Sequence, residues 1–334
     1  MRRLLLCLVV ALVAPANAFA GSRVSAFYYP WYGTFAKDGA YQHWSQDGHL
    51  PPNDIASAYY PAAGVYSSSD RLVVAGQLDE IRAAGIDEIA VSWWGQGSPE
   101  DRRMPAIVAA AQADGIGVAA HLEPYEGRTV ASIVDDVSYL ESTYGIRTFY
   151  VYRPLDLPIP DWAGAHPGLH AVPDVTVYAQ TALAGAAAAA GFDGVYTYDI
   201  VTFGGNTFRR ICDEAHAAHL ICAPSVGPGY DARRGSGDPV VKPRRNGRTY
   251  DAMWRAAIGG EADRVTITSF NEWHEGTQIE PAAPRHRARY RYQSYDGAWG
   301  LHGAAAETAY LVRTRYWADV FRSTSPVQPN TSAS

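Results

Sequence analysis

Two glutamates three residues apart, Glu272 and Glu275, are the residues in this sequence whose type and spacing best suit catalysis. They follow the alternating apolar run 265–270, which has the composition of a buried strand. If the chain turns helically there, the two side chains face the same way, with Cβ atoms about 5–6 Å apart, and can bracket one substrate bond as acid and base. A solvated acidic turn is the alternative. The adjacent Trp273 and His274 argue against it, because a solvated turn has no use for an indole and an imidazole.

The overall composition narrows the class of protein and of partner. An apolar fraction of 47% over 334 residues is ordinary for a globular protein. The formal net charge of −6 argues against a nucleic acid or an anionic membrane surface as the main partner. The 22 Tyr and 9 Trp hint at a sugar ligand, because aromatic rings stack on the apolar faces of sugars, although such residues also pack cores.

The N-terminus has the three parts of a secretory signal peptide, predicted over residues 1–20. Arg2 and Arg3 precede the apolar run 4–13, and small residues then provide cleavage sites after Ala18 or Ala20. The apolar run is too short to span a membrane comfortably. We therefore expect no membrane partner after signal removal, and export to the medium or to a cell-envelope compartment.

The cysteines leave two possibilities open. Cys7 is removed with the signal peptide, and Cys212 and Cys222 remain. They can pair, because export permits disulfides, or they can stay as two buried free thiols. No Cys/His spacing resembles a zinc site, so we predict neither a metal nor a cofactor.

The rest of the chain alternates apolar β-type runs with Ala-rich helical stretches. The predicted strands are 24–29, 88–93, 117–122, 148–152, 175–178, 194–198, 220–225 and 265–270. The predicted helices are 72–84, 104–114, 130–144, 182–190, 208–219, 250–258 and 307–321. Just past helix ends, where a left-handed cap is favoured, stand Gly85, Gly115, Gly145 and Gly191.

Eight strands alternating with helices in one domain predict an α/β fold, a (β/α)8 TIM barrel, over residues 21–322. A doubly wound open sheet is the alternative, but no glycine-rich dinucleotide fingerprint follows the first strand. The Ser/Thr/Pro-rich tail, 323–334, is predicted to be disordered.

Two long connections, 30–71 after the first strand and 226–249 after the seventh, are too long to be mere filler in a compact barrel. The second contains a basic stretch, 242–248, which we interpret as a solvated loop rather than a phosphate site. Within it, Arg244 and Asn246 are candidate contacts to sugar hydroxyls.

The predicted C-terminal ends of the strands bring aromatic rings, imidazoles and carboxylates to one face of the barrel, where such enzymes keep their chemistry. Each ring taken alone could be core filling. Together they suit a neutral, polyhydroxylated ligand, and which tyrosine of each pair faces inward stays open. The candidate binding residues are Tyr28, Tyr29, His43, Trp93, Trp94, His121, Glu123, Tyr196, Tyr198 and Asn271.

Seven segments in these positions resemble glycoside hydrolase family 99, the endo-acting α-mannosidases and α-mannanases. They run in family order over nearly the whole mature chain, and the last of them is long and specific. They are FYYPWYG at 27–33, His43-Trp44, Ser92-Trp93, HLEPYEGR at 121–128, GFDGVYTY at 191–198, SVGPGY at 225–230 and SFNEWHEGTQIE at 269–280.

The resemblance implies a retaining endo-hydrolase in which neither carboxylate attacks the anomeric carbon. By analogy with the family, Glu272 deprotonates the mannose 2-hydroxyl, whose oxygen closes onto C1 to give a 1,2-anhydro sugar. Glu275 protonates the leaving oxygen and then activates water. The 2-hydroxyl of mannose is axial and trans to an α-leaving group, so it is aligned for this attack. Glu275 must be protonated at working pH, and we therefore expect its pKa to be raised.

The resemblance also bears on the substrate, which we expect to be α-mannan or a high-mannose oligosaccharide. Trp94 matches bacterial mannan-degrading members, whereas animal Golgi members have Tyr there and recognise glucose. Glu123 points the same way, because animal members have Gln at that position. We therefore expect a bacterial-type endo-α-1,2-mannanase. Separately, we expect the protein to be a monomer.

Three alternatives stay open. The first is specificity for a glucosyl-mannose unit of glycoprotein glycans, in the same barrel. The second is a non-catalytic mannan-binding protein, which would have little reason to keep both glutamates. The third is a metal hydrolase using His121 and His274, although no His-x-His or His-Glu-x-x-His spacing is present.

Overall fold

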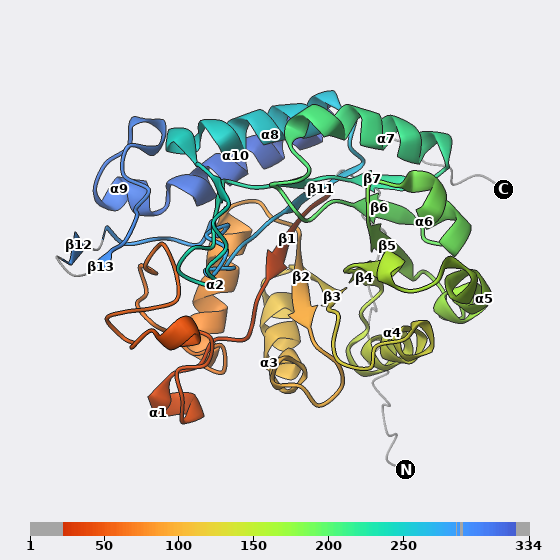
Figure 1. Ribbon diagram of the computed structural model, residues 1–334, viewed down its shortest axis with the longest axis horizontal. Coiled ribbons are helices and arrows are strands. Elements are labelled where there is room, and N and C mark those ends of the chain that lie inside the picture. The colour runs from red at the N-terminus through yellow and green to blue at the C-terminus, as the bar shows by residue number, and fades with distance from the viewer. Residues whose placement is uncertain (1–22, 285, 288–289, 325–334) are drawn as a thin grey trace, which may run out of the picture.

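The computed structural model describes residues 23–284, 286–287 and 290–324 (Figure 1). A parallel sheet in the order β7-β6-β5-β4-β3-β2-β1-β11-β8 forms its centre. The strands are β1 (Arg23–Tyr28), β2 (Glu88–Trp93), β3 (Gly117–Leu122), β4 (Thr148–Val151), β5 (Thr176–Gln180), β6 (Gly194–Tyr196), β7 (Ile221–Ala223), β8 (Ser225–Val226) and β11 (Arg264–Ile267). The predicted signal peptide lies outside the described residues, as does the tail from residue 325 onward.

The sheet closes on itself at Pro224. β7 pairs with β6, and β8 pairs with β11, so the two ends of the strand order belong to one continuous segment, 221–226. Proline has no backbone N–H to donate, which explains why the ladder is interrupted at this residue. The (β/α)8 TIM barrel predicted from the alternation of strands and helices is thereby confirmed.

Helices surround this sheet on the outside, as Figure 1 shows. They are α2 (Arg71–Ala83), α3 (Pro99–Ala113), α4 (Val130–Tyr144), α5 (Ile159–Leu169), α6 (Ala184–Ala190), α7 (Phe208–Ala217), α8 (Arg248–Gly259) and α10 (Ala309–Thr324). The four glycines predicted to end helices all have left-handed φ values between +69° and +83°. Within the described residues, the helices are too short or too polar for a bilayer crossing.

Several predicted elements or boundaries were wrong, two of them where proline or glycine obscured the pattern. The structure contains α5, which was not predicted because its sequence is rich in Pro and Gly. Helix α3 begins at Pro99 instead of residue 104. The Oγ of Ser98 caps this helix by accepting a hydrogen bond from the Asp101 N–H. Strand β11 ends at Ile267 instead of residue 270, and helix α10 continues through Thr324, into the tail predicted to be disordered.

The remaining elements are short and lie in the loops. Two short helices are α1 (Phe35–Asp38) and α9 (Ala304–Glu307), and two small antiparallel pairs are β9 (Tyr230–Asp231) with β10 (Val241–Lys242) and β12 (His286–Arg287) with β13 (Tyr290–Arg291). Single 3₁₀ turns occupy Gln46–Gly48, Pro154–Asp156, Gly205–Thr207, Arg245–Gly247 and Ala298–Gly300.

The long segments that follow β1, β8 and β11 gather on one side of the barrel, seen as the red-orange, teal and blue chain at the left of Figure 1. Direct contacts hold them together. The Arg234 guanidinium reaches Asp54 at 2.5 Å, and an isolated bridge joins Tyr59 to Gln293. The loops are therefore packed against one another and form a fixed rim beside the strand ends.

The opposite end of the barrel buries a charge network. Glu88, at the start of β2, accepts from Arg264 at 3.0 Å and lies 3.4 Å from the Arg23 guanidinium. The Ser25 hydroxyl donates to the same carboxylate at 2.8 Å, and Arg264 also donates to the Tyr178 hydroxyl at 3.0 Å. This carboxylate is buried, and its charge is balanced by arginines.

Two cysteines of the described chain are joined. Cys212 on α7 and Cys222 on β7 form a disulfide, with their Cα atoms 5.2 Å apart. The structure thus decides between the two possibilities left by the sequence, and the bond ties the outer helix to the strand that it covers.

Candidate active site

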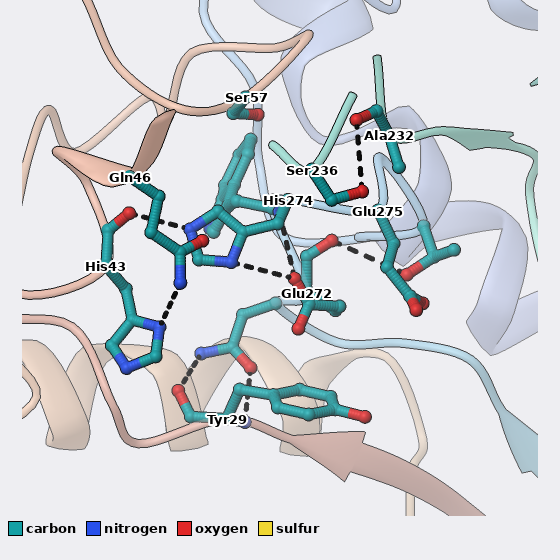
Figure 2. Close-up of polar contacts among 12 residues, drawn as sticks. Tyr29, His43, Gln46, Ser57, Ala232, Ser236, Glu272, His274 and Glu275 are labelled. Carbon is teal, nitrogen blue, oxygen red and sulfur yellow. Dashed lines mark hydrogen bonds and ion pairs between the residues drawn. The ribbon is translucent and has the colours of Figure 1, made fainter. Parts of the chain in front are cut away.

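Glu272 and Glu275 lie on a tight turn that follows β11 at the barrel mouth. The Glu272 N–H donates to the Ser269 hydroxyl at 2.7 Å, and the His274 N–H donates to Glu272 Oε1 at 2.9 Å. The Gly276 N–H closes the turn on the Trp273 carbonyl at 3.2 Å. Figure 2 shows both carboxyl groups on the same side of the turn, facing Tyr29. The side chains therefore lie on one face of the turn, as the i, i+3 spacing predicts.

The environment of the two carboxyls favours retention of protons. Burial raises the pKa of Glu275 to about 7, and the nearby carboxylates of Asp199 and Glu123 add to the effect. Burial also raises the pKa of Glu272 well above its usual range, and the charge of Glu275 raises it further. Among the described residues, no arginine or lysine pairs with either carboxyl. The raised pKa expected for Glu275 is thus present.

Two tyrosine hydroxyls lie beside this pair. Tyr29 follows β1, and its hydroxyl hydrogen-bonds the hydroxyl of Tyr198, which lies 3.4 Å from Glu275 Oε2. Tyr198 has a left-handed backbone, with φ of +51°, held by the Ser225 hydroxyl at its N–H and by Thr268 at its carbonyl. Such a conformation is strained for a tyrosine and is typical of functional sites. Burial raises the pKa of both phenols, so both stay neutral and can donate.

A second group of predicted residues lies at the ends of β2, β3 and β6. His121 Nδ1 lies 3.1 Å from Glu123 Oε1, and its Nε2 lies 3.0 Å from the Tyr196 hydroxyl. The Ser92 hydroxyl donates to Glu123 at 2.8 Å and accepts from the Trp94 indole at 3.2 Å. Trp94 keeps 36% of its surface exposed, so part of its indole is free to contact a ligand.

His43 and His274 form an aromatic wall on the far side of Glu272. The His43 ring stacks on Trp31 with centroids 4.5 Å apart, and His274 Nε2 contacts the His43 carbonyl at 2.8 Å (Figure 2). Burial lowers the pKa of His43 to about 3 and that of His274 to about 4. Both imidazoles are therefore neutral at ordinary pH and leave the charge of Glu272 uncompensated.

A third buried acid, Glu280, holds the turn from behind. It accepts from the Trp273 indole at 2.7 Å, from the Tyr66 hydroxyl at 2.8 Å and from the Gln77 amide at 2.7 Å. Burial raises its pKa to about 7. Glu280 thus fixes the side chain next to Glu272.

The structure corrects the prediction of sugar contact for four residues. Tyr28 and Trp93 point out of the barrel, because neighbouring residues of a strand face opposite ways; their polar atoms donate to Gln77 and to Asp101 on the covering helices. Asn271 is fully buried, and it accepts from the Tyr29 N–H at 2.7 Å and donates to the Tyr29 carbonyl at 3.1 Å.

Arg244 is the fourth corrected residue. It lies buried behind the turn, where its guanidinium donates to the Gly276 carbonyl at 2.9 Å and to the Gln278 carbonyl at 2.7 Å. The basic stretch 242–248 is predicted to be a solvated loop, but Arg244 within it is buried. Asn271 and Arg244 therefore support other site residues from within the protein.

Three residues at the mouth are absent from the candidate binding residues, Trp31, Ser92 and Tyr152, and His274 was considered only as a metal ligand. The sequence contained a usable pattern for Tyr152, which lies two residues after Tyr150 and so on the same face of the strand; its ring centroid is 5.2 Å from that of Tyr198. Trp31 comes after a strand end, where the period of two no longer applies, and its orientation depends on the loop.

Comparison with known proteins agrees with this geometry. The model of glycosyl hydrolase family 99 matches residues 20–159 and 176–323. A Danio rerio protein named glycoprotein endo-alpha-1,2-mannosidase-like protein is 34% identical, over 89% of this chain and 78% of its own length. The Mus musculus glycoprotein endo-alpha-1,2-mannosidase is 30% identical, over 92% and 76% respectively.

A solved structure is similar over its whole length. The GH99 endo-alpha-mannosidase from Bacteroides thetaiotaomicron superposes with a TM-score of 0.80 at 29% identity, covering 91% of this chain and 99% of that chain. The barrel and the sequence matches lead to the same assignment. This chain belongs to glycosyl hydrolase family 99, a family of endo-α-mannosidases, and is a glycoside hydrolase.

Proposed function

We propose that this enzyme is a retaining endo-α-mannosidase that cleaves within α-mannose chains by attack of the substrate's own 2-hydroxyl. The observation that supports it most is the pair of carboxyls on one turn, the buried Glu272 and the half-buried Glu275, which lie beside two phenols and have no cationic partner among the described residues. Such a pair can hold one proton and one charge at neutral pH, as acid–base catalysis requires.

In the first step, Glu272 accepts the proton of the mannose 2-hydroxyl while that oxygen forms a bond to C1. The bond from C1 to the leaving oxygen breaks, and Glu275 supplies the proton that this oxygen needs. The products are a 1,2-anhydro sugar and a free hydroxyl on the departing part of the chain. Glu272 is now protonated and Glu275 is charged.

In the second step, Glu275 takes a proton from water, and the water oxygen attacks C1. The bond from C1 to the 2-oxygen breaks, and Glu272 returns its proton to that oxygen. Two inversions at C1 give net retention, and both carboxyls recover their starting protonation states. Glu275 thus acts as acid and then as base.

Hydrogen bonds decide which carboxyl starts with the proton, because burial raises the pKa of both. The backbone N–H groups of His274 and Glu275 donate to Glu272 and favour its charged form. A mannose 2-hydroxyl donating to Glu272 would add to this preference. Glu275 accepts one long hydrogen bond, from the Tyr198 hydroxyl at 3.4 Å, which favours its charged form through a single contact where Glu272 has two. We therefore assign the starting proton to Glu275.

We further propose that mannose, and not glucose, is the sugar recognised beside Trp94. This indole is partly exposed and is joined through Ser92 to the carboxylate of Glu123. Such a subsite favours a sugar that stacks a ring face on the indole and donates a hydroxyl to the carboxylate. The substrate on this proposal is α-1,2-linked mannan, and a disaccharide is released.

The test is to incubate the mature enzyme with α-1,2-branched mannan and with a glucosylated high-mannose glycan, and to analyse the products by size. A mannose disaccharide from mannan, formed as the α-anomer by early ¹H NMR, supports the proposal. A glucose-containing disaccharide instead would keep the family and overturn the specificity. A first-formed β-anomer would overturn the mechanism.

Export is proposed on two grounds, the N-terminal pattern of charged, apolar and small residues and the Cys212–Cys222 disulfide, which suits an oxidising compartment. Sequencing the N-terminus of the protein from its native host would test this. A mature chain beginning after residue 18 or 20 agrees with the proposal, whereas an intact Met1 contradicts it.

A further inference from the structure

Arg244 is a buried cation whose surroundings do not match an ordinary structural arginine. Three aromatic rings face its guanidinium, those of Tyr59, Tyr295 and Tyr310, at 4.6 to 4.7 Å from their centroids. Within the described part of the chain, no Asp or Glu forms an ion pair with it. A buried charge without an acid is costly, so such an arginine is expected to have a use.

The hydrogen bonds of Arg244 go to the segment that carries the catalytic pair. One nitrogen, Nη2, donates both to the Gly276 carbonyl at 2.9 Å and to the Gln278 carbonyl at 2.7 Å. A charged donor binds a neutral carbonyl more strongly than a neutral donor does. Gly276 directly follows Glu275, so the contact lies one peptide away from the carboxyl that we assign as acid.

The peptide just before it, between Glu275 and Gly276, is held as well. The Asp231 N–H donates to the Glu275 carbonyl at 2.7 Å. Gly276 has φ of +63°, and a Cβ at this position would lie 3.0 Å from the Asp231 carbonyl oxygen. The backbone at 275–276 is therefore confined between the loop of Asp231 and the guanidinium of Arg244.

Packing alone does not hold the turn here, because a cavity of about 280 Å³ lies beside it. Gly276, Asp231 and Arg244 are all in its lining, together with polar residues such as Gln293 and Asn246. Without the arginine, the peptide after Glu275 would have room to move. A displacement of about 1 Å at a catalytic group can lower a rate about a hundredfold.

We propose that Arg244 is a positioning residue that holds Glu275 in place to protonate the leaving oxygen. This rests on the proposed acid role of Glu275. Arg244 touches no substrate in this account; it acts through the carbonyls of Gly276 and Gln278. Its loss should therefore impair the reactions that need the acid and spare those that do not.

The test compares two substrates that differ in how much they need the acid. An α-1,2-linked mannan oligosaccharide has a sugar alkoxide as leaving group, which must be protonated, whereas an α-mannobiosyl fluoride loses fluoride with little help. The quantity measured is kcat/KM on each, for Arg244→Met, Arg244→Lys and Glu275→Gln. Their ratio cancels any difference in the fraction of folded enzyme.

We expect Arg244→Met to lose about tenfold to a hundredfold on the oligosaccharide and to stay within about threefold of the wild type on the fluoride. Arg244→Lys keeps the charge but has a single ammonium to place, so its loss should be intermediate. If Arg244→Met does not fold, Arg244→Lys and Tyr295→Phe carry the test, because the Tyr295 hydroxyl also donates to the Gln278 carbonyl, at 3.0 Å.

Arg313→Lys is the matched control. Arg313 also lies over aromatic rings and makes a paired contact to Asp251, at 2.6 and 2.7 Å, away from the catalytic turn. Its variant should lower stability without changing the ratio between the two substrates.

The outcomes separate this inference from the proposed function. If Glu275→Gln is selective for the fluoride and the Arg244 variants lose equally on both substrates, or lose nothing, the positioning role is overturned. If Glu275→Gln itself loses equally on both, the acid role of Glu275 fails, and with it the basis of the proposal. If Glu275→Gln and the Arg244 variants all lose activity on the oligosaccharide but not on the fluoride, the acid role of Glu275 and the positioning role of Arg244 are both supported.

Discussion

The two ends of this barrel bury carboxylates in opposite ways. At the base, Glu88 is paired with Arg264 at 3.0 Å and with Arg23 at 3.4 Å, and it also accepts from a serine hydroxyl. At the mouth, the buried Glu272 and the half-buried Glu275 lie among phenols and neutral imidazoles, with no arginine or lysine paired to them in the described chain. One end balances its charge, and the other leaves it unbalanced.

The difference shows where the barrel is built for stability and where it is built for chemistry. A buried carboxylate with arginine partners stays charged and contributes to a closed network. A buried carboxyl without a cation keeps its proton to a higher pH, which gives an acid that works near neutrality. The unpaired end is less favourable for folding, and this is the usual condition of an active site.

The largest expected effect is on activity, from removing charge at the mouth. Glu272→Gln keeps the shape of the side chain but cannot accept the 2-hydroxyl proton, so kcat should fall by about 10³- to 10⁴-fold. The melting temperature should stay equal or rise, because a buried, unpaired acid has been replaced by a neutral amide. Rates on α-mannan and thermal unfolding of the same preparation check both points; a folded variant with wild-type activity would refute the base role.

The next effect is on stability, from removing charge at the base. Glu88→Gln leaves the largely buried Arg264 without an acidic partner and should lower the free energy of unfolding by about 3–5 kcal/mol. Activity per folded molecule should not change. Denaturant unfolding measures the loss, and the double variant Glu88→Gln/Arg264→Gln should recover part of it in a double-mutant cycle. Full additivity of the two single losses would show that the pair is not coupled.

A smaller effect is expected from pH. Glu275 must be protonated to act as acid, and its pKa is about 7, so kcat/KM should fall about tenfold per unit as the pH rises above that value. Glu272 must be charged to act as base, and burial raises its pKa, so the rate should also fall toward acid pH and the profile should be bell-shaped. The raised pKa of Glu275 also affects folding. Because the folded pKa exceeds the ordinary value of 4.5, the stability contribution is full below pH 4.5 and is lost as the pH rises through about 7.

A matched pair of profiles isolates the cause of that pH dependence. Glu275→Gln should lack the upper limb in activity and should lessen the decline in stability. Other buried acids also titrate in this range, Glu280 among them, so part of the stability change should remain. An unaltered upper limb in the Glu275 variant would assign that limb to another group.

The smallest effect is on substrate choice. Trp94→Tyr should reduce the preference for mannan over a glucosylated glycan by about tenfold, because only one wall of a sugar subsite changes. The ratio of kcat/KM on the two substrates measures it. Trp93→Phe is a suitable control, since that indole points away from the mouth toward Asp101, and its change should leave the ratio as it was. Equal ratios in the wild type, Trp94→Tyr and Trp93→Phe would show that Trp94 does not determine the choice of substrate.

The sequence predicted the barrel because the evidence for it is local. Each apolar run and each helix-ending glycine can be recognised within about ten residues, and the four glycines adopt the expected left-handed backbone. The position of the pair Glu272 and Glu275 follows from the same reasoning, as two residues on one turn after a strand. Prolines and glycines within 158–168 hid α5, since those residues are poor predictors of a helix.

The orientation of single side chains was harder to predict than the elements. The period of two could have separated Tyr28 from Tyr29 and Trp93 from Trp94, once the strand ends were known. No local pattern could have placed Asn271 on the backbone of Tyr29, 242 residues away, or Arg244 on a turn 32 residues later. These contacts depend on how distant loops pack, and only the folded chain shows them.

The most direct test of the central claim measures disaccharide release from α-1,2-mannan by four proteins in parallel: the wild type, Glu272→Gln, Glu275→Gln and Glu88→Gln. Rates are normalised to folded protein by circular dichroism. The account predicts that both mouth variants lose at least about a hundredfold, while the base variant matches the wild type per folded molecule. A mouth variant with wild-type release, or a base variant with a comparable loss, would contradict the contrast between the two ends of the barrel.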